Sequence, residues 1–333
     1  MEEEYEVESI VGDKVVDGEQ FFLLKWKGYA AEWNTWEPEA NLACPSIVAG
    51  YWKKKKMKKL TGKYAVGFDP AEIFGSPKLH RLRVVNTVDK AQLPTTFTYI
   101  DGYVRSPLVP RPSAVTFPCS CRPGAPCGED CDCMPVPYYD ENGLLCTDYP
   151  GPISECSDLC ECSADCPNRV VQRGNVIDID IFRTGAKGWG ALTRKAIRKG
   201  EYVCRYTGEL LSSAEAERRN VNDTTYLFDL DREVPTGKQA QFTIDARSYG
   251  NVSHFFNHSC DPNMVIRAVY INHLDPRLHE LAFFAIRDIG AGEELTFDYS
   301  PSSTDGPPLP RQRKDSSMFD CHCGASDCRR HIF

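Results

Sequence analysis

Cysteine is the residue type whose spacing in this sequence most clearly predicts chemistry. The chain has sixteen cysteines, most of them in tight clusters, whereas Cys44, Cys146 and Cys204 stand alone. Clustered thiols in an intracellular protein of this size favour metal ligation, while disulfides are typical of small secreted proteins. The N-terminus is acidic where a signal peptide would be basic, and no apolar run approaches the length of about 20 residues that spans a bilayer. We therefore expect an intracellular protein with zinc-bound cysteines and no membrane partner.

Two of the clusters together supply nine thiols: Cys119, Cys121, Cys127, Cys131, Cys133, Cys156, Cys160, Cys162 and Cys166. Zinc takes four ligands in a tetrahedron, so nine thiolates satisfy three zinc ions when three of the thiolates each bridge two metals. Cys-x-Cys steps favour ligation of adjacent metals. The alternative is two separate four-cysteine sites with one spare thiol. Both arrangements are closed sites, so the expected role of the zinc is structural.

The third cluster lacks one zinc ligand, because Cys321, Cys323 and Cys328 are only three thiols. Cys260 is the best candidate for the fourth ligand, although it lies about sixty residues upstream. His322 and His331 are the alternatives. If Cys260 is the ligand, the zinc fixes the C-terminal tail beside the Asn-His-Ser-Cys segment that ends at Cys260, and the metal takes part in assembling an active site.

Two domains are expected from the length of 333 residues. In the first, Asp17-Gly18 between two apolar runs predicts a β-hairpin, whose second strand runs on to Gly28. A third strand is expected at 35–37, with Trp36 in the core, and a closing helix at 45–59. The first domain should therefore be a three-stranded antiparallel sheet with a C-terminal helix.

The second domain is expected to be mainly β. Its expected strands cover residues 83–88, 177–182, 202–206, 225–230, 242–245 and 281–285. One helix should begin at Ser212, where Ser212-Ser213-Ala214-Glu215 forms a capping-box pattern. A loop rich in serine, proline and glycine follows at 300–318, before the last cysteine cluster.

Several motifs give a resemblance to a known family. The segments 257–263 (NHSCDPN) and 294–299 (ELTFDY) resemble the two signature segments of SET-domain lysine methyltransferases. Residues 187–190 (KGWG) resemble the cofactor-binding turn of that family and 206–209 (YTGE) another of its strands. The nine-cysteine block resembles its pre-SET region and the last cluster its post-SET region. This combination, over about 84–333, is similar to the suppressor-of-variegation type of histone H3 lysine-9 methyltransferase.

The resemblance implies an active site that uses S-adenosylmethionine. The matched catalytic positions are Tyr299, whose hydroxyl would orient the substrate amine, Tyr226 in the lysine channel, and Phe297. Phe297 has no hydroxyl to hold a water that would block rotation of a methylated amine, so dimethylation and trimethylation are expected. The matched cofactor-binding residues are Lys187, Gly188, Trp189, Gly190, Tyr206, Asn257, His258 and His331. Three zinc ions in the pre-SET cluster and one at the SET/post-SET junction are implied.

Two positions differ from the usual pattern of the family or vary within it. Arg330 and His331 stand where relatives usually show glycine followed by an aromatic residue, so either His331 or Phe333 is expected to cover the cofactor. His254 occupies a position where relatives carry either His or Arg. It is expected either to tune activity or simply to be packed or solvent-facing.

The reaction sets a requirement on the site. The attacking lysine amine must be neutral, whereas an unperturbed lysine has a pKa near 10.4. Desolvation and the positive charge of the cofactor would both favour the neutral form. Tight alignment of the reactants can then lower the barrier by about 7 to 11 kcal/mol.

The first domain resembles a chromodomain of the heterochromatin type. Tyr5, Trp26 and Tyr29 match the three aromatic positions of that family's methyl-lysine cage. A methylated ammonium loses hydrogen-bond donors but is attracted to aromatic faces, so a cage of rings suits it. Trp33 stands where many such domains carry an acidic residue, which leaves the preference between dimethyl- and trimethyl-lysine open.

These features predict a nuclear protein of heterochromatin, in which the histone H3 tail is both substrate and chromodomain ligand. The lysine-rich segment from Lys53 to Lys63 suggests contact with nucleosomal DNA, with a nuclear-import signal or a solvated helix end as alternatives. Lys314, in Arg-Lys-Asp-Ser, is a hypothetical automethylation site, with a solvated basic loop as the alternative. The competing function is a chromatin-binding scaffold with weak or no catalytic activity.

The expected domain order follows from these motifs. It is a chromodomain at 5–60, a linker at 61–83, an N-terminal flank with the pre-SET zinc cluster at 84–175, a SET catalytic domain at 176–300, a flexible loop at 301–318 and a post-SET region at 319–333.

Overall fold

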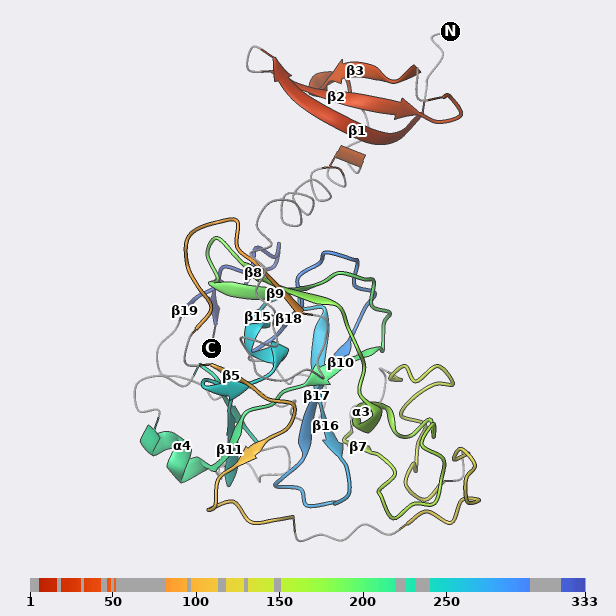
Figure 1. Cartoon of the computed structure of the whole chain (residues 1–333), viewed down its shortest axis with the longest axis vertical. Coiled ribbons are helices and arrows are strands. Elements are labelled where there is room, and N and C mark those ends of the chain that lie inside the picture. The colour runs from red at the N-terminus through yellow and green to blue at the C-terminus, as the bar shows by residue number, and fades with distance from the viewer. Residues whose placement is uncertain are drawn as a thin grey trace. The chain divides into compact units, whose positions relative to one another are not determined.

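The computed structural model of the chain consists of two compact units, Met1–Ala65 and Val66–Phe333. The structure describes residues 6–16, 19–30, 33–42, 47–48, 51, 82–94, 97–112, 118–128, 131–146, 151–219, 225–230, 240–299 and 319–332. Figure 1 shows both units. Within the described ranges, no helix has the length and apolar character needed to cross a membrane.

The smaller unit is a three-stranded antiparallel sheet in the order β1-β2-β3, built from β1 (Val7–Val16), β2 (Glu19–Trp26) and β3 (Thr35–Pro38) and followed by the 3-10 helix η2 (Glu39–Asn41). Val16 pairs with Glu19, which confirms the hairpin. The buried residues Ile10, Phe22 and Leu24 form its core. Of the expected closing helix the structure describes Ile47, Val48 and Tyr51, which are helical and pack against this core.

The prediction that Trp36 is a core residue is wrong, because its side chain is 41% exposed. The register pairs Trp36 with Leu23, and successive side chains of a strand point to opposite faces. Since Phe22 and Leu24 face the core, Leu23 and Trp36 face away from it. The Lys14 ammonium lies 4.4 Å from the centre of the Trp36 ring, which gives this outward ring a cation–π partner.

The larger unit has a central sheet in the order β10-β17-β16-β18-β15, with β7 (Ile153–Ser154) paired to β16. Its other members are β10 (Tyr202–Arg205), β17 (Glu280–Ala285), β16 (Met264–Tyr270), β18 (Thr296–Phe297) and β15 (Asn257–His258). Leu281 to Ala285 are all buried, as expected for a strand covered on both faces.

Smaller sheets surround the central one. One has the order β12-β13-β11-β6, with β12 (Leu227–Asp229), β13 (Phe242–Asp245), β11 (Glu209–Ser212) and β6 (Val104–Arg105). Another has the order β4-β8-β9, with β4 (Leu82–Val85), β8 (Ile179–Arg183) and β9 (Trp189–Thr193). Two strand pairs complete the unit: β5 (Thr98–Tyr99) with β14 (Tyr249–Gly250), and β19 (Phe319–Asp320) with β20 (His331–Ile332).

The strand expected at 83–88 ends earlier, at Val85. The side-chain oxygen of Asn86 accepts hydrogen bonds from the backbone N–H groups of Val88 and Asp89. This local turn competes with the sheet ladder, as asparagine side chains commonly do, and terminates the strand.

The helices of the larger unit are short. The helix expected at Ser212 is α4 (Ser213–Arg219), and the Ser212 hydroxyl accepts from the Glu215 backbone N–H at 3.2 Å, as an N-cap does. The Glu215 carboxylate accepts from Ser106 and Arg219. Within the described residues of this unit, the other helices are α3 (Val170–Arg173) and the 3-10 helix η3 (Val252–Phe255).

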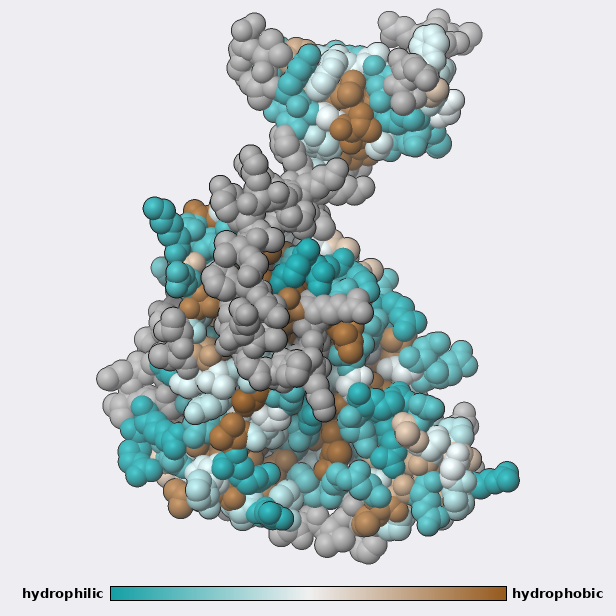
Figure 2. Space-filling model, in the orientation of Figure 1, coloured by the Kyte–Doolittle hydropathy of each residue, from teal (hydrophilic) through white to brown (hydrophobic). Residues whose placement is uncertain are grey.

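Apolar burial in the larger unit falls into two main clusters. The first lies among the strands of the central and smaller sheets, and the second joins the cysteine-dense segment to β7, α3 and residues of β10, β16 and β17. Figure 1 shows the cysteine-dense segment as irregular loops beside α3 and β7. On the face of this unit visible in Figure 2, apolar residues are scattered among polar ones.

Candidate active site and metal centres

The two signature segments meet in the central sheet. Strand β15 pairs in parallel with β18, which places Asn257 opposite Thr296 and His258 opposite Phe297. The parallel pairing therefore joins residues that lie about forty positions apart in the sequence. A cavity of about 420 Å³ opens beside this junction.

The cavity collects most of the residues that the resemblance assigned to the reaction. Its walls include Lys187, Gly188, Trp189, Tyr206, Tyr226, Asn257, His258, Phe297 and Tyr299. The C-terminal tail contributes another wall, made by Asp320, Cys321, His322, Cys323 and Ile332. The volume is within the range of pockets that hold small-molecule cofactors.

Tyr299 is held at both its backbone and its hydroxyl. The hydroxyl donates to the backbone carbonyl of Phe256 at 2.7 Å, and the Tyr299 backbone N–H donates to His258 Nδ1 at 3.2 Å. Burial raises the pKa of Tyr299 well above its usual value, so the phenol stays neutral. Because its proton is engaged by Phe256, the phenol oxygen can offer only lone pairs to a group in the cavity.

Tyr226 is positioned from both sides. Its backbone carbonyl accepts from the Tyr206 hydroxyl at 2.9 Å, and its ring stacks on His254. His254 Nδ1 lies 2.7 Å from the Ala246 carbonyl, which can only accept, so Nδ1 carries the proton. Burial lowers the pKa of His254 to about 4, so the ring is neutral. The structure thus matches the expectation that His254 is a packed side chain.

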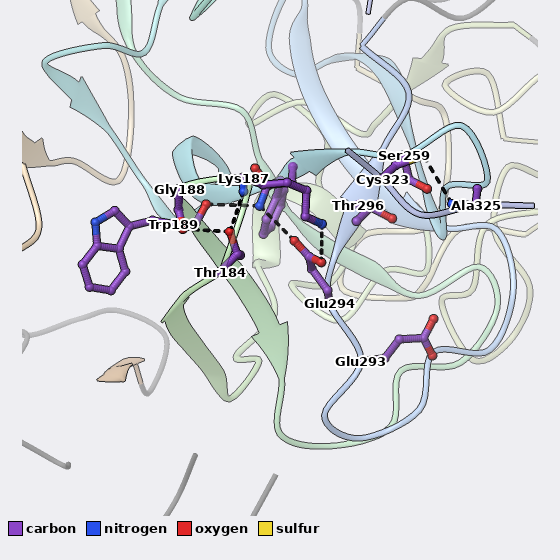
Figure 3. A network of polar contacts seen from close by, with 12 residues as sticks. Thr184, Lys187, Gly188, Trp189, Ser259, Glu293, Glu294, Thr296, Cys323 and Ala325 are labelled. Atoms are coloured by element: carbon purple, nitrogen blue, oxygen red, sulfur yellow. Dashed lines mark hydrogen bonds and ion pairs between the residues drawn. The ribbon is translucent and has the colours of Figure 1, made fainter. Parts of the chain in front are cut away.

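A polar network anchors the cofactor-turn residues. The Lys187 ammonium lies 2.6 Å from Glu294 Oε2, and Glu294 Oε1 accepts from the Asn257 amide at 2.9 Å. The same amide nitrogen donates to the Trp189 carbonyl at 3.1 Å. Figure 3 shows Lys187 and Glu294 facing each other, while the Trp189 ring projects away from them. Both amide hydrogens of Asn257 are thus engaged within the protein, so its oxygen is the group suited to meet a donor on a ligand.

Gly188 and Gly190 of the turn are each required for a different structural reason. Gly188 adopts φ +75°, the left-handed region that favours glycine. At Gly190, an added Cβ would lie 2.9 Å from Asn257 Nδ2 and 3.0 Å from Glu294 Oε1. Any side chain at Gly190 would therefore displace the network that holds Asn257.

The nine pre-SET cysteines are spaced as zinc ligands. Neighbouring sulfurs lie 3.7 Å apart for Cys119 and Cys127, and 3.6 Å apart for Cys133 and Cys160. Two ligands of a tetrahedral zinc with bonds of about 2.3 Å lie about 3.8 Å apart, whereas a disulfide bond is about 2.05 Å long. All the described cysteines are free thiols. The donor set and its spacing fit zinc.

Three overlapping groups of four sulfurs occur in this cluster. They are Cys119, Cys133, Cys156 and Cys160; Cys119, Cys127, Cys156 and Cys162; and Cys119, Cys121, Cys127 and Cys131, with the sulfurs of each group within 4.8 Å of one another. Cys166 lies 3.9 Å from Cys156 through their sulfurs. The sharing of Cys119, Cys127 and Cys156 between groups matches a connected cluster with bridging ligands.

Cys260 joins the three cysteines of the tail. The sulfurs of Cys260, Cys321, Cys323 and Cys328 all lie within 4.8 Å of one another, and Cys260 is 3.8 Å from Cys321. The alternative ligand His322 lines the cavity, whereas the side chain of His331 is exposed and is not among the cavity walls. The wall position next to His331 is taken by Ile332. The expectation that His331 covers the cofactor thus finds no contact with the cavity in this structure.

In the smaller unit, Trp26 ends β2 and Tyr29 follows in a turn, closed by a hydrogen bond from the Tyr29 N–H to the Trp26 carbonyl at 3.3 Å. Tyr29 is 45% exposed and Trp33 is 67% exposed, so both rings can meet a ligand.

Some of the predicted site residues lie outside the described part of the chain, and the expectations for them stay predictions. They are Tyr5, Lys53 to Lys63, Lys314 and Phe333.

Sequence reasoning missed the residues that position the site from a distance. Glu294 was part of a matched segment without a role, and neither Arg329 nor Asp298 was singled out. Arg329 lies 2.6 Å from Asp298. Pro94, which lines the cavity, was not predicted as a site residue either. Ion pairs between distant segments leave no local pattern, but an acidic residue directly before Tyr299 was a usable signal.

Comparisons with known families agree with this architecture. Residues 188–300 match the SET domain, residues 76–169 the Pre-SET motif, and residues 5–54 the Chromo (chromatin organisation modifier) domain.

Similar proteins cover nearly the whole chain. The histone-lysine N-methyltransferase SUV39H2 of Bos taurus is 37% identical over 98% of this chain and 88% of its own length. SUV39H1-A of Danio rerio is 36% identical over 99% of this chain and 90% of its own. The chain therefore belongs to the SUV39H histone-lysine N-methyltransferases, a family of S-adenosylmethionine-dependent enzymes.

Solved structures share the fold. The Neurospora SET-domain protein DIM-5, a histone lysine methyltransferase, is 36% identical with a TM-score of 0.61, over 73% of this chain and 100% of that one. KRYPTONITE, solved in complex with mCHH DNA, an H3(1-15) peptide and SAH, is 30% identical with a TM-score of 0.65, over 78% of this chain and 53% of that one.

Proposed function

We propose that this protein methylates lysine 9 of histone H3, forming dimethyl- and trimethyl-lysine, and that it acts in heterochromatin. The observation that carries the proposal is the single cavity in which the cofactor-turn residues, the Asn257–His258 strand and the pair Phe297 and Tyr299 share one space. The SUV39H family membership supports lysine 9 as the target.

In this proposal S-adenosylmethionine, when bound, supplies the electrophilic methyl group. Asn257 would hold the cofactor's amino-acid portion, and Glu294, itself paired with Lys187, accepts a hydrogen bond from the Asn257 amide and keeps it in place. Trp189, Tyr206 and His258 form further cofactor walls.

The protein's own residues prepare the substrate lysine. The phenol oxygen of Tyr299 orients the amine by accepting from it, because its proton is held by Phe256. Tyr226 and the buried Phe297 wall the lysine channel and keep water out, which favours the neutral amine. Phe297 has no hydroxyl to anchor a water, so a methylated amine has room to turn.

We propose three zinc ions in the pre-SET cluster and one bound by Cys260 and the tail cysteines. Such closed sites serve structure and stabilise the fold. The junction site would fix the tail wall of the cavity beside Asn257 and His258.

The chromodomain would bind methyl-lysine on an H3 tail with Tyr5, Trp26 and Tyr29, so that a modified nucleosome recruits the enzyme to its neighbours. The proposed order is chromodomain 5–60, linker 61–83, pre-SET region 84–175, SET domain 176–300, loop 301–318 and post-SET region 319–333.

A methyltransferase assay tests the proposal. The full chain and S-adenosylmethionine are incubated with an H3 tail peptide and with the same peptide carrying arginine at lysine 9, and mass spectrometry counts methyl groups. Addition of two and three methyl groups to the first peptide alone is expected. No methylation of either peptide would favour the scaffold function, and equal methylation of both would contradict the lysine 9 assignment.

A further inference from the structure

One arginine of the C-terminal tail contacts the segment that carries Tyr299. Arg329 Nη2 lies 2.6 Å from Asp298 Oδ1, and Asp298 directly precedes Tyr299. The two side chains are only 35% and 19% exposed, so this charged hydrogen bond is partly shielded from water. Arg329 itself directly follows the tail cysteine Cys328.

The same arginine touches the other two functional segments. Its backbone N–H donates to Cys260 Sγ at 3.4 Å, and its Nη2 lies 3.5 Å from His258 Nε2. His258 Nδ1 lies 3.5 Å from Asp298 Oδ1 and accepts from the Tyr299 N–H. Arg329, Asp298 and His258 therefore form one contact group, which we name the tail latch.

The tail latch connects two parts of the cavity wall, the C-terminal tail and Tyr299. The tail supplies one wall through Asp320, His322 and Ile332, while the opposite end of the latch adjoins Tyr299. Because the Arg329 backbone meets Cys260 and its side chain pairs with Asp298, a displacement of the tail would also move the charged partner of Asp298. Movement of the tail away from the cavity would thus remove a constraint on the backbone of Tyr299.

We infer that Arg329 is a positioning residue that couples closure of the cofactor cavity by the tail to the alignment of Tyr299, acting through Asp298. This inference rests on the proposed methyltransferase function. It assigns Arg329 a role distinct from zinc binding, because the side chain pairs with a carboxylate while only its backbone N–H meets a sulfur.

The test compares Arg329→Gln, Arg329→Lys, Asp298→Asn and the double variant Arg329→Gln/Asp298→Asn. Three quantities are measured on the full chain: zinc per chain, the affinity for S-adenosylhomocysteine by calorimetry, and kcat and KM on an H3 peptide. Arg330→Gln is the matched control, because Arg330 is the adjacent arginine and its side chain is exposed.

Arg329→Gln should keep its zinc but lose about 10- to 100-fold in kcat, because a misplacement of an aligned group by about 1 Å can cost about 100-fold. Its affinity for S-adenosylhomocysteine should fall about 10-fold, while KM for the peptide changes little. Arg329→Lys should recover part of both losses. Asp298→Asn should reproduce them, and the double variant should be no worse than the worse single variant.

Wild-type kcat and affinity in Arg329→Gln would overturn the inference. So would additive losses in the double variant, or loss of zinc from Arg329→Gln while Asp298→Asn keeps full activity, because Arg329 would then act only through the metal site. Failure of the wild-type chain to methylate any peptide would instead refute the proposed function, and the affinity measurements would still decide whether the latch closes the cavity.

Discussion

The imidazole of His254 lies face to face with the ring of Tyr226, with centroids 4.3 Å apart and an angle of 3° between the planes. His254 is itself fixed by the Ala246 carbonyl and packs against Phe97 at 4.4 Å between ring centroids. His254 therefore fixes the ring of Tyr226, which forms a wall of the proposed lysine channel, and His254 can do so without contacting the substrate.

Replacement of His254 by alanine should remove this support and let the Tyr226 ring move. We expect kcat on an H3 peptide to fall about 10- to 100-fold, because small misplacements of aligned groups are costly. The control His254→Phe keeps a flat ring for stacking and should retain most of the activity. Equal activity of the alanine and phenylalanine variants would show that the stack does not position Tyr226.

His254 should also make folding stability depend on pH. Its pKa is lowered from about 6.5 to about 4 in the folded protein, mainly by burial and also by Arg247, while Asp245 and the Ala246 carbonyl oppose the shift. Between these pH values only the unfolded chain takes up the proton, so the free energy of unfolding decreases as the pH falls from about 6.5 to about 4. The decrease attributable to His254 is at most about 3 kcal/mol.

Urea unfolding of the wild type and His254→Phe between pH 7 and pH 4.5 measures this effect. The wild type should lose more stability than the variant over that range. Parallel pH profiles for the two proteins would contradict it.

Arg169 should stabilise the pre-SET metal cluster. Its Nε and Nη2 both lie 3.4 Å from Cys162 Sγ, and Nη2 also donates to the Ser157 carbonyl at 2.8 Å. A thiolate-rich cluster carries excess negative charge, which this buried guanidinium offsets. Arg169→Gln should release zinc to a chromogenic chelator about 10-fold faster or more.

The control for Arg169 is Arg198→Gln, since Arg198 has a side chain that is 60% exposed and pairs with Glu201. Its zinc release should match that of the wild type. The same rate in Arg169→Gln and the wild type would refute the role of Arg169.

Arg330 is strained in the tail. It adopts φ +71°, a left-handed conformation that costs a non-glycine residue about 1 kcal/mol or more. Arg330→Gly should relieve this strain and slow hydrogen exchange of the Cys321 N–H, which donates to the Arg330 carbonyl at 3.0 Å. Arg330→Ala keeps the strain and should exchange like the wild type, whereas faster exchange in the glycine variant would count against the prediction.

The sequence predicts this protein well where the information is local. The hairpin of the first domain, the cap at Ser212 and the strand 242–245 all depend on neighbouring residues, and the structure confirms them. Cys260 could be matched to the tail cysteines because a zinc site needs a fourth ligand, which is a constraint that reaches across the chain.

Other features escaped prediction because distant partners decide them. Trp36 is a large aromatic residue of the kind often found in cores, and only its pairing with Leu23 shows that its side chain points away from the core. Lys187 with Glu294 and Arg329 with Asp298 are charged residues that read as ordinary surface groups until the sheet brings them together. The helix η3 was missed, although Asn251 caps it by accepting from the Ser253 N–H at 2.9 Å, which is a readable local signal.

Tyr299→Phe tests the central claim most directly, because it removes one oxygen atom and keeps the ring that packs against Phe297 at 4.7 Å between centroids. The measurements are methyl transfer to an H3 tail peptide and calorimetric affinity for S-adenosylhomocysteine. We predict that transfer falls by at least about 100-fold while the affinity stays near that of the wild type, since the hydroxyl acts on the amine and not on the cofactor. Undiminished transfer by Tyr299→Phe would contradict the account.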